Sequence, residues 1–102
     1  MSLAIRQMRY FKITAGGGYH RDWGGDPTCW LEVNEAGDAE RQLETYPNGN
    51  VLSYDRTHQD DEYGALAVMV VDGDEDWWEQ YKSTKDEFEQ AWQTHSPLNR
   101  TA

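Results

Sequence analysis

The sequence predicts an α+β domain, in which an antiparallel meander sheet of four to five strands is packed on one face by a C-terminal amphipathic helix. Extended segments between residues 29 and 56 are interrupted by two turn sequences, at 34–38 and 47–49. Apolar residues then recur three and four apart between residues 88 and 95. Turns between short strand-like runs are typical of a meander, and the later spacing is typical of a helix that covers a sheet.

Length and composition limit the chain to one domain. With 102 residues it can bury a single core, which we expect to span residues 9–96, between a disordered leader over 1–8 and a loose tail over 97–102. Only 37% of the residues are hydrophobic, but five Trp and six Tyr concentrate burial in large side chains. One cysteine excludes an intramolecular disulfide, and no segment resembles a signal peptide or a membrane helix. We therefore expect a cytoplasmic protein without a membrane partner.

The net charge of −10 is concentrated in the second half of the chain. Residues 55–90 carry twelve acidic and three basic side chains, whereas residues 1–54 carry seven and five. Such a field repels nucleic acid and speeds association with a basic protein. The same charge also keeps an ordinary domain soluble, and the sequence leaves both interpretations open.

Alternation of apolar and polar residues predicts four strands, over residues 9–15, 29–34, 39–46 and 50–56. In the second strand Cys29, Leu31 and Val33 share one face, which we expect to meet the core. The charged residues of the second and third strands are expected to form cross-strand ion pairs on a solvent-exposed face. They are Glu32, Glu40, Arg41 and Glu44.

The two turns also make local predictions. Gly37 and Gly49 occupy positions that favour a positive φ. Across the second hairpin Tyr46, Leu52 and Tyr54 are close enough to form an aromatic cluster.

The remaining apolar run, ALAVMVV at residues 65–71, predicts a buried strand, with a short helix as the alternative. We expect it to lie centrally in the sheet or under the C-terminal helix. Residues 77–81 then predict a short helical turn, with Trp77 and Tyr81 on one side.

A capping box at Thr84 and Glu87 predicts the start of the C-terminal helix. Its apolar stripe, which includes Phe88 and Trp92, is expected to pack on the sheet, with Glu89 facing water. The Ser-Pro sequence at 96–97 ends the helix.

The candidate partner-binding residues are one tryptophan and the acidic residues of the second half. Trp23 lies in a glycine-rich loop, residues 16–28, where it either folds back onto the core or serves as an exposed anchor. The acidic candidates are Asp60, Asp61, Glu62, Asp72, Asp74, Glu75 and Asp76. Those at 72–76 also have a structural explanation, because negative charge stabilises the start of a helix.

We assign no catalytic, cofactor-binding or metal-ligating residue. His58 and the acidic residues after it do not have the spacing of a calcium loop, and the three histidines do not have zinc-site spacing. Cys29 has no base beside it in sequence and is interpreted as a small buried hydrophobe.

Several short motifs resemble a family of small, acidic bacterial domains of uncharacterised function. They are an opening RYFKIT strand, a Glu–Gly–Glu-Arg turn and strand, an aromatic-x-x-Gly hairpin and a closing EFExxW helix. The matching residues are Glu32, Gly37, Glu40, Arg41, Tyr46, Gly49, Glu87, Phe88, Glu89 and Trp92. The family has no established activity, so the resemblance implies no catalytic residue. By analogy with immunity proteins, its small size and acidity imply binding to another protein.

Three hypotheses for the function follow. The first is a small binding protein, similar to an immunity protein or inhibitor, that masks a basic partner such as a nuclease toxin. The second is a structural or accessory domain that forms a homodimer through an exposed strand edge. The third is a small hydrolase-type enzyme that uses His20 or His58 with neighbouring carboxylates, including Asp22.

Overall fold

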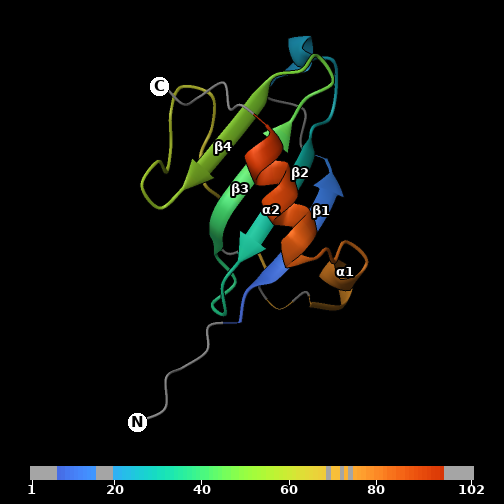
Figure 1. The fold of residues 1–102 in the computed structure, drawn as a ribbon, viewed down its shortest axis with the longest axis vertical. Helices are drawn as coiled ribbons and strands as arrows, with labels where there is room; N and C mark the ends of the chain where they lie inside the picture. The colour runs from blue at the N-terminus through green and yellow to red at the C-terminus, as the bar shows by residue number, and fades with distance from the viewer. Residues whose placement is uncertain (1–6, 16–19, 69, 72, 74, 96–102) are drawn as a thin grey trace.

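The centre of the protein is a four-stranded antiparallel sheet with the strand order β1-β2-β3-β4 (Figure 1). The computed structural model describes residues 7–15, 20–68, 70, 71, 73 and 75–95. The strands are β1 (Arg9–Thr14), β2 (Thr28–Val33), β3 (Ala39–Thr45) and β4 (Val51–Asp55). A 3-10 turn, η2 (Arg21–Trp23), precedes β2, and the helices α1 (Glu75–Glu79) and α2 (Lys85–Thr94) follow the sheet. The predicted α+β meander with a C-terminal helix is confirmed.

Both predicted turns of the meander contain a glycine in the left-handed backbone region. The φ angle is 92° at Gly37 and 94° at Gly49. Gly49 lies in open space, whereas a Cβ atom on Gly37 would meet the carbonyl oxygen of Val71 at 2.1 Å. The backbone of Val71 donates to the carbonyl of Gly37 at 3.1 Å. Gly37 is therefore required both by the turn and by the close approach of a second chain segment.

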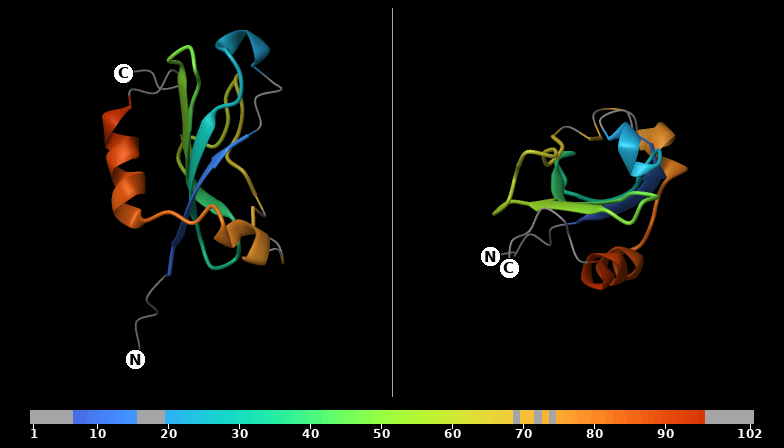
Figure 2. Two further views of the ribbon diagram at one scale, coloured as in Figure 1. Left: turned by 90° about the vertical axis from the view of Figure 1, so that its right-hand side faces the viewer. Right: turned by 90° about the horizontal axis from the view of Figure 1, so that it is seen from above.

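Helix α2 covers one face of the sheet (Figure 2). The side chain of Thr84 accepts the amide of Glu87 at 3.1 Å, which confirms the threonine half of the predicted capping box, and the side chain of Glu87 pairs with Lys12 at 3.3 Å. Phe88 is fully buried and Ala91 is nearly so, and the Phe88 ring lies 5.6 Å from the ring of Tyr10 on β1. The apolar stripe of the helix packs on the sheet as expected.

The opposite face of the sheet is covered as well, by residues 59–68, which we call the covering segment, and by α1 (Figure 2). Phe11, Leu31 and Val33 form a buried cluster on this face. Cys29 and Leu31 both point to it, as the alternation of β2 predicts. The predicted cluster of Tyr46, Leu52 and Tyr54 is also present.

The prediction of a strand or helix over residues 65–71 is wrong for the part that the structure describes. Ala65 makes one isolated bridge, residues 66 and 67 have no regular structure, and residues 68, 70 and 71 form bends. The segment lies on the face opposite α2, and not in the sheet or under the helix. Its backbone bonds to the turn between β2 and β3, because the amide of Ala39 donates to the carbonyl of Ala67 at 3.3 Å. The sheet has two apolar faces, and this run is needed to cover the second.

The predicted location of the ion pair between Glu32 and Arg41 is also wrong. The pair lies beneath α2 and not on a solvent-exposed face. Both carboxylate oxygens of Glu32 accept from Arg41, and Tyr10 Oη donates to Glu32 Oε2 at 2.8 Å. Glu89 of α2, expected to face water, forms a second ion pair with Arg41. The guanidinium lies over the rings of Phe88 and Trp92, at 4.7 Å and 5.2 Å from their centroids. Arg41 can be covered by a helix because the helix supplies a carboxylate and two aromatic faces.

Candidate functional site

Helix α1 places a tryptophan on the outside of the molecule. Trp77 is 49% exposed, and Val68 is the other large hydrophobic residue exposed to this degree in the described part of the chain. The Trp77 ring packs against Trp78 at 5.1 Å and against Tyr81 at 5.0 Å. Trp78 in turn contacts the buried ring of Phe11 at 5.1 Å. Trp77 is therefore held outward by a chain of aromatic contacts that begins in the core.

The short helix that carries this tryptophan also carries three carboxylates. Glu75, Asp76 and Glu79 of α1 are all exposed. The backbone after the helix is fixed to the edge of β1, where the amide of Lys12 donates to the carbonyl of Tyr81 at 2.9 Å. We call Glu75, Asp76, Trp77 and Glu79 the α1 surface. Two further candidates, Asp72 and Asp74, lie outside the described residues.

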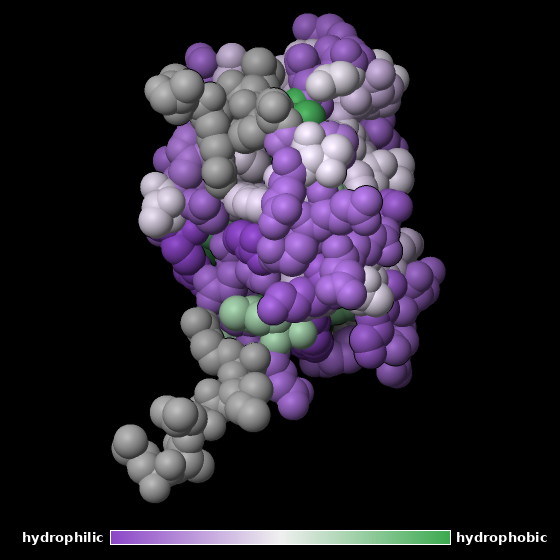
Figure 3. Space-filling model, viewed as in Figure 1, coloured by the Kyte–Doolittle hydropathy of each residue, from purple (hydrophilic) through white to green (hydrophobic). Residues whose placement is uncertain are grey.

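The remaining acidic candidates lie elsewhere. Asp60 and Glu62 are exposed on the loop that follows β4, whereas α1 lies beside β1 at the other edge of the sheet (Figures 1 and 2). On the α2 side, the surface between these two regions is predominantly hydrophilic (Figure 3). Among the described residues, the acidic candidates therefore lie in two separate regions, at opposite edges of the sheet.

Asp61 has a structural role within the loop. Its Oδ1 accepts the amides of Tyr63 and Gly64 at 2.8 Å and 3.1 Å, and the hydroxyl of Tyr54 at 2.9 Å. Such bonds from an aspartate to the backbone that follows it fix a tight turn. Because the side chain is only 15% exposed, it contributes little to an acidic contact surface.

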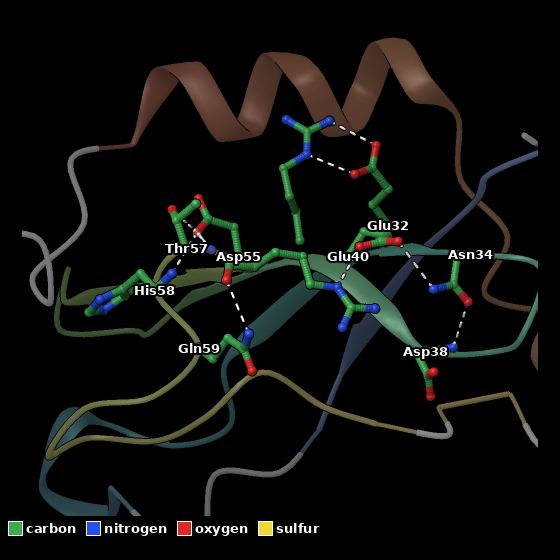
Figure 4. Close-up of polar contacts among 10 residues, drawn as sticks. Glu32, Asn34, Asp38, Glu40, Asp55, Thr57, His58 and Gln59 are labelled. Atoms are coloured by element: carbon green, nitrogen blue, oxygen red, sulfur yellow. Dashed lines mark hydrogen bonds and ion pairs between the residues drawn. The ribbon is translucent and has the colours of Figure 1, made fainter.

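A similar turn follows β4 directly (Figure 4). Asp55 accepts the amides of Thr57 and His58, each at 2.9 Å. The ring of His58 then contacts Asp61 at 3.3 Å and stacks on Tyr54. These contacts close the loop at the end of the sheet.

Trp23 folds back onto the domain. Its ring stacks on His20 with centroids 3.9 Å apart, and it meets Tyr46 edge-on at 4.8 Å. His20 Nε2 bonds to the carbonyl of Tyr63 at 2.8 Å, and because a carbonyl only accepts, this nitrogen carries the proton. Trp23 is half-buried in this cluster, so it offers a partner less surface than Trp77 does.

The two histidines of the enzyme hypothesis have separate partners. His20 bonds to Tyr63, whereas His58 contacts Asp61. Asp22 is exposed on η2. In the described part of the chain, no group of three or more His, Cys, Asp or Glu side chains is arranged to hold a metal ion.

A cavity of about 620 Å³ lies on the sheet face opposite α2. Its walls are the sheet, the covering segment and Trp78 of α1. Apolar side chains such as Ile13, Leu31 and Val70 line most of it, and Glu44 and Gln42 of β3 supply polar groups. The sequence pattern does not predict this cavity, because the predicted architecture covers only one face of the sheet.

Cys29 lies in the wall of the same cavity. Burial raises the pKa of its thiol to about 12, and the negative charges of Glu44 and Asp26 act in the same direction. A thiol with such a pKa is not ionised near neutral pH and is a poor nucleophile. Cys29 was predicted to be a small buried hydrophobe, and it is half-buried in the structure.

No protein-family model matches this chain, and neither a curated protein nor a solved structure is significantly similar to it. The resemblance to small acidic bacterial domains therefore stays a prediction. No helix in the described ranges has the length and apolar character needed to cross a membrane.

Proposed function

We propose that this chain is an acidic binding domain that recognises a basic protein through the α1 surface. The observation that carries the proposal is Trp77, an exposed aromatic ring that packs against Trp78 and Tyr81 on a helix with three exposed carboxylates. Tryptophan is enriched among residues that dominate binding energies, because it buries a large area with little loss of conformational freedom.

The charges around Trp77 favour a cationic partner. Of the carboxylates of α1, Glu79 pairs with Lys82 at 3.6 Å, on an exposed part of the surface. An exposed pair of this kind is weak and can be exchanged for a partner's cation. Glu75 and Asp76 extend the negative field beside the ring, and the net charge of −10 adds long-range attraction.

The biological role that fits this surface is that of an inhibitor. Enzymes that act on nucleic acids bind phosphates with clusters of Lys and Arg, and an acidic protein can cover such a cluster. The expected similarity to immunity proteins suggests the same role, and it remains an analogy.

The accessory-domain alternative requires a strand edge for the homodimer. The outer edge of β1 is blocked, because the amide of Ser83 donates to the carbonyl of Tyr10 at 2.7 Å. Strand β4 is the other terminal strand of the sheet. A homodimer formed by strand pairing would therefore use β4, at the opposite edge from the α1 surface.

The experiment begins with capture of a partner from a lysate of the source cells and measurement of its affinity for the purified domain. Trp77→Ala is expected to weaken binding at least about tenfold, because it removes the central aromatic contact. The control is Asp60→Asn with Glu62→Gln, which removes two exposed charges at the opposite edge and is expected to change the affinity less than about threefold.

The opposite ranking of the two variants would overturn the assignment of the surface. Light scattering of the free domain tests the alternative, since a concentration-dependent dimer disrupted by a proline in β4 would support strand pairing. A captured protein that binds Trp77→Ala as tightly as the original chain contradicts the proposal.

A further inference from the structure

The cavity on the second face of the sheet has the size and lining of a small-molecule site. Its volume of about 620 Å³ falls within the range of roughly 300–1,000 Å³ that is typical of such sites. The floor is formed by side chains of β1 and β2, including Ile13 and Leu31, and the roof by the covering segment. Apolar walls with few polar groups favour a ligand with an apolar body.

The cavity wall holds the imidazole of His20, which is bonded to the carbonyl of Tyr63, and one carboxylate, that of Glu44. Glu44 is the only Asp, Glu, Lys or Arg among the described residues that line the cavity. Within the described part of the chain, no Lys or Arg forms an ion pair with Glu44. A carboxylate in an apolar recess without a cation favours a ligand that supplies one.

Hydrogen bonds hold the carboxylate of Glu44 in place. The hydroxyl of Tyr46 donates to Oε1, and Nε2 of Gln42 donates to Oε2, both at 2.8 Å. Each oxygen has a second lone pair, so both can still accept from a ligand. The acceptor is therefore oriented before any ligand arrives.

Gln42 connects this carboxylate to the covering segment. Its Oε1 accepts the amide of Ala67 at 2.9 Å, and its Nε2 also donates to the carbonyl of Ala65 at 3.2 Å. The same side chain thus fixes both the roof of the cavity and the group expected to bind the ligand. The polar end of the cavity is therefore held in a defined geometry by hydrogen bonds.

We propose that the cavity binds a small organic ammonium ion, with its apolar body against Ile13 and Leu31 and its N–H groups on the carboxylate of Glu44. A primary ammonium donates three hydrogen bonds and carries the charge that the site lacks. Tyr46 and Trp78 also line the cavity, and aromatic ring faces attract cations. An anionic ligand would be repelled by Glu44. The proposal uses a surface separate from the α1 surface and does not depend on the proposed function.

The test is titration of the full chain with 2-phenylethylammonium, followed by amide chemical shifts in NMR spectra. Saturable shifts are expected at Gln42, Glu44 and Ala67. The uncharged analogue 2-phenylethanol and the anion 3-phenylpropionate are expected to bind at least about tenfold more weakly, a loss of about 1.4 kcal/mol.

Two variants in the cavity and one control variant test whether the ligand binds there. Glu44→Gln keeps the shape and is expected to reduce affinity for the ammonium at least about tenfold without changing affinity for the alcohol. Glu79→Gln makes the same change of net charge on exposed α1 and is expected to have no effect. Ala65→Phe narrows the cavity from an exposed position and is expected to weaken both the ammonium and the alcohol, so it tests the site even if Glu44→Gln does not fold.

The proposal is overturned if the ammonium causes no saturable shifts at concentrations up to about 10 mM, a limit that corresponds to a binding free energy weaker than about −3 kcal/mol. It is also overturned if the alcohol binds as tightly as the ammonium, or if Glu79→Gln weakens binding as much as Glu44→Gln does.

Discussion

Arg41 binds both carboxylate oxygens of Glu32 beneath α2, with Nε and Nη2 each 2.8 Å from its acceptor. The pair joins β2 to β3, and the additional ion pair from Arg41 to Glu89 joins the sheet to the helix. Because Glu32 is 92% buried, its carboxylate depends on Arg41 and Tyr10 for compensation of the charge.

The first prediction concerns this pair. Arg41→Gln is expected to lower the free energy of unfolding by roughly 3–5 kcal/mol, because it leaves the Glu32 charge buried without a cation. Adding Glu32→Gln is expected to recover part of that loss, because the double variant buries no charge. Urea denaturation of the four proteins in the cycle gives the coupling energy. A double variant as unstable as the sum of the single variants would show that the two side chains act independently.

A second prediction follows from the pKa of Glu32. Burial raises the pKa of this carboxyl, but the hydrogen bonds from Arg41 and Tyr10 and the charge of Arg41 outweigh burial, so the pKa lies below its usual value. Below the pKa of the unfolded chain, about 4.3, the unfolded state binds more protons than the folded state. The stabilisation by Glu32 is therefore complete above that pH and is lost as the pH falls through the folded pKa. Denaturation between about pH 6 and pH 2 should show a smaller loss of stability in Glu32→Gln than in the original chain, and parallel curves would contradict the role of the pair.

The two turn glycines provide a matched pair of variants. Gly37→Ala is expected to cost roughly 3 kcal/mol or more, because it combines a strained φ with a contact against the carbonyl of Val71. Gly49→Ala has nearly the same φ but open space around it, so about 1 kcal/mol is expected. Thermal or urea unfolding measures both. Equal losses would mean that the close approach of Val71 to this turn is not part of the folded state.

Chemical modification tests the environment of Cys29. With a thiol pKa of about 12, the folded protein is expected to react with iodoacetamide at pH 8.5 at least about thirtyfold more slowly than the urea-unfolded chain, since the small thiolate fraction outweighs its higher intrinsic reactivity. Glu44→Gln is expected to raise the rate, because it removes one of the charges that raise the pKa. A folded rate close to the unfolded rate would place Cys29 outside the cavity wall.

Local patterns in the sequence were enough to predict the strands, the turns and the start of α2. Alternation in β2, the glycines at 37 and 49 and the capping threonine at 84 each depend on neighbours within a few residues. The failures involve contacts between distant segments. Glu89 was expected to face water because its partner, Arg41, is 48 residues away. The position of the covering segment was not predicted because it is set by hydrogen bonds to Ala39 and Gln42, which are distant in the sequence. The cavity exists only where those segments meet, so the sequence did not predict Glu44 as a binding residue.

The proposed function depends on attraction between a basic partner and the α1 surface, and the affinity of the captured partner at low and high ionic strength tests that claim most directly. For the original chain we expect the affinity to fall at least about tenfold between about 50 mM and about 500 mM salt, because salt screens exposed charges. The variant Glu75→Gln with Asp76→Asn should bind more weakly at low salt and show a smaller dependence on salt, whereas Asp60→Asn with Glu62→Gln should follow the original chain. An affinity that does not change with salt, or a Glu75 and Asp76 variant that retains the full dependence, would contradict the proposal.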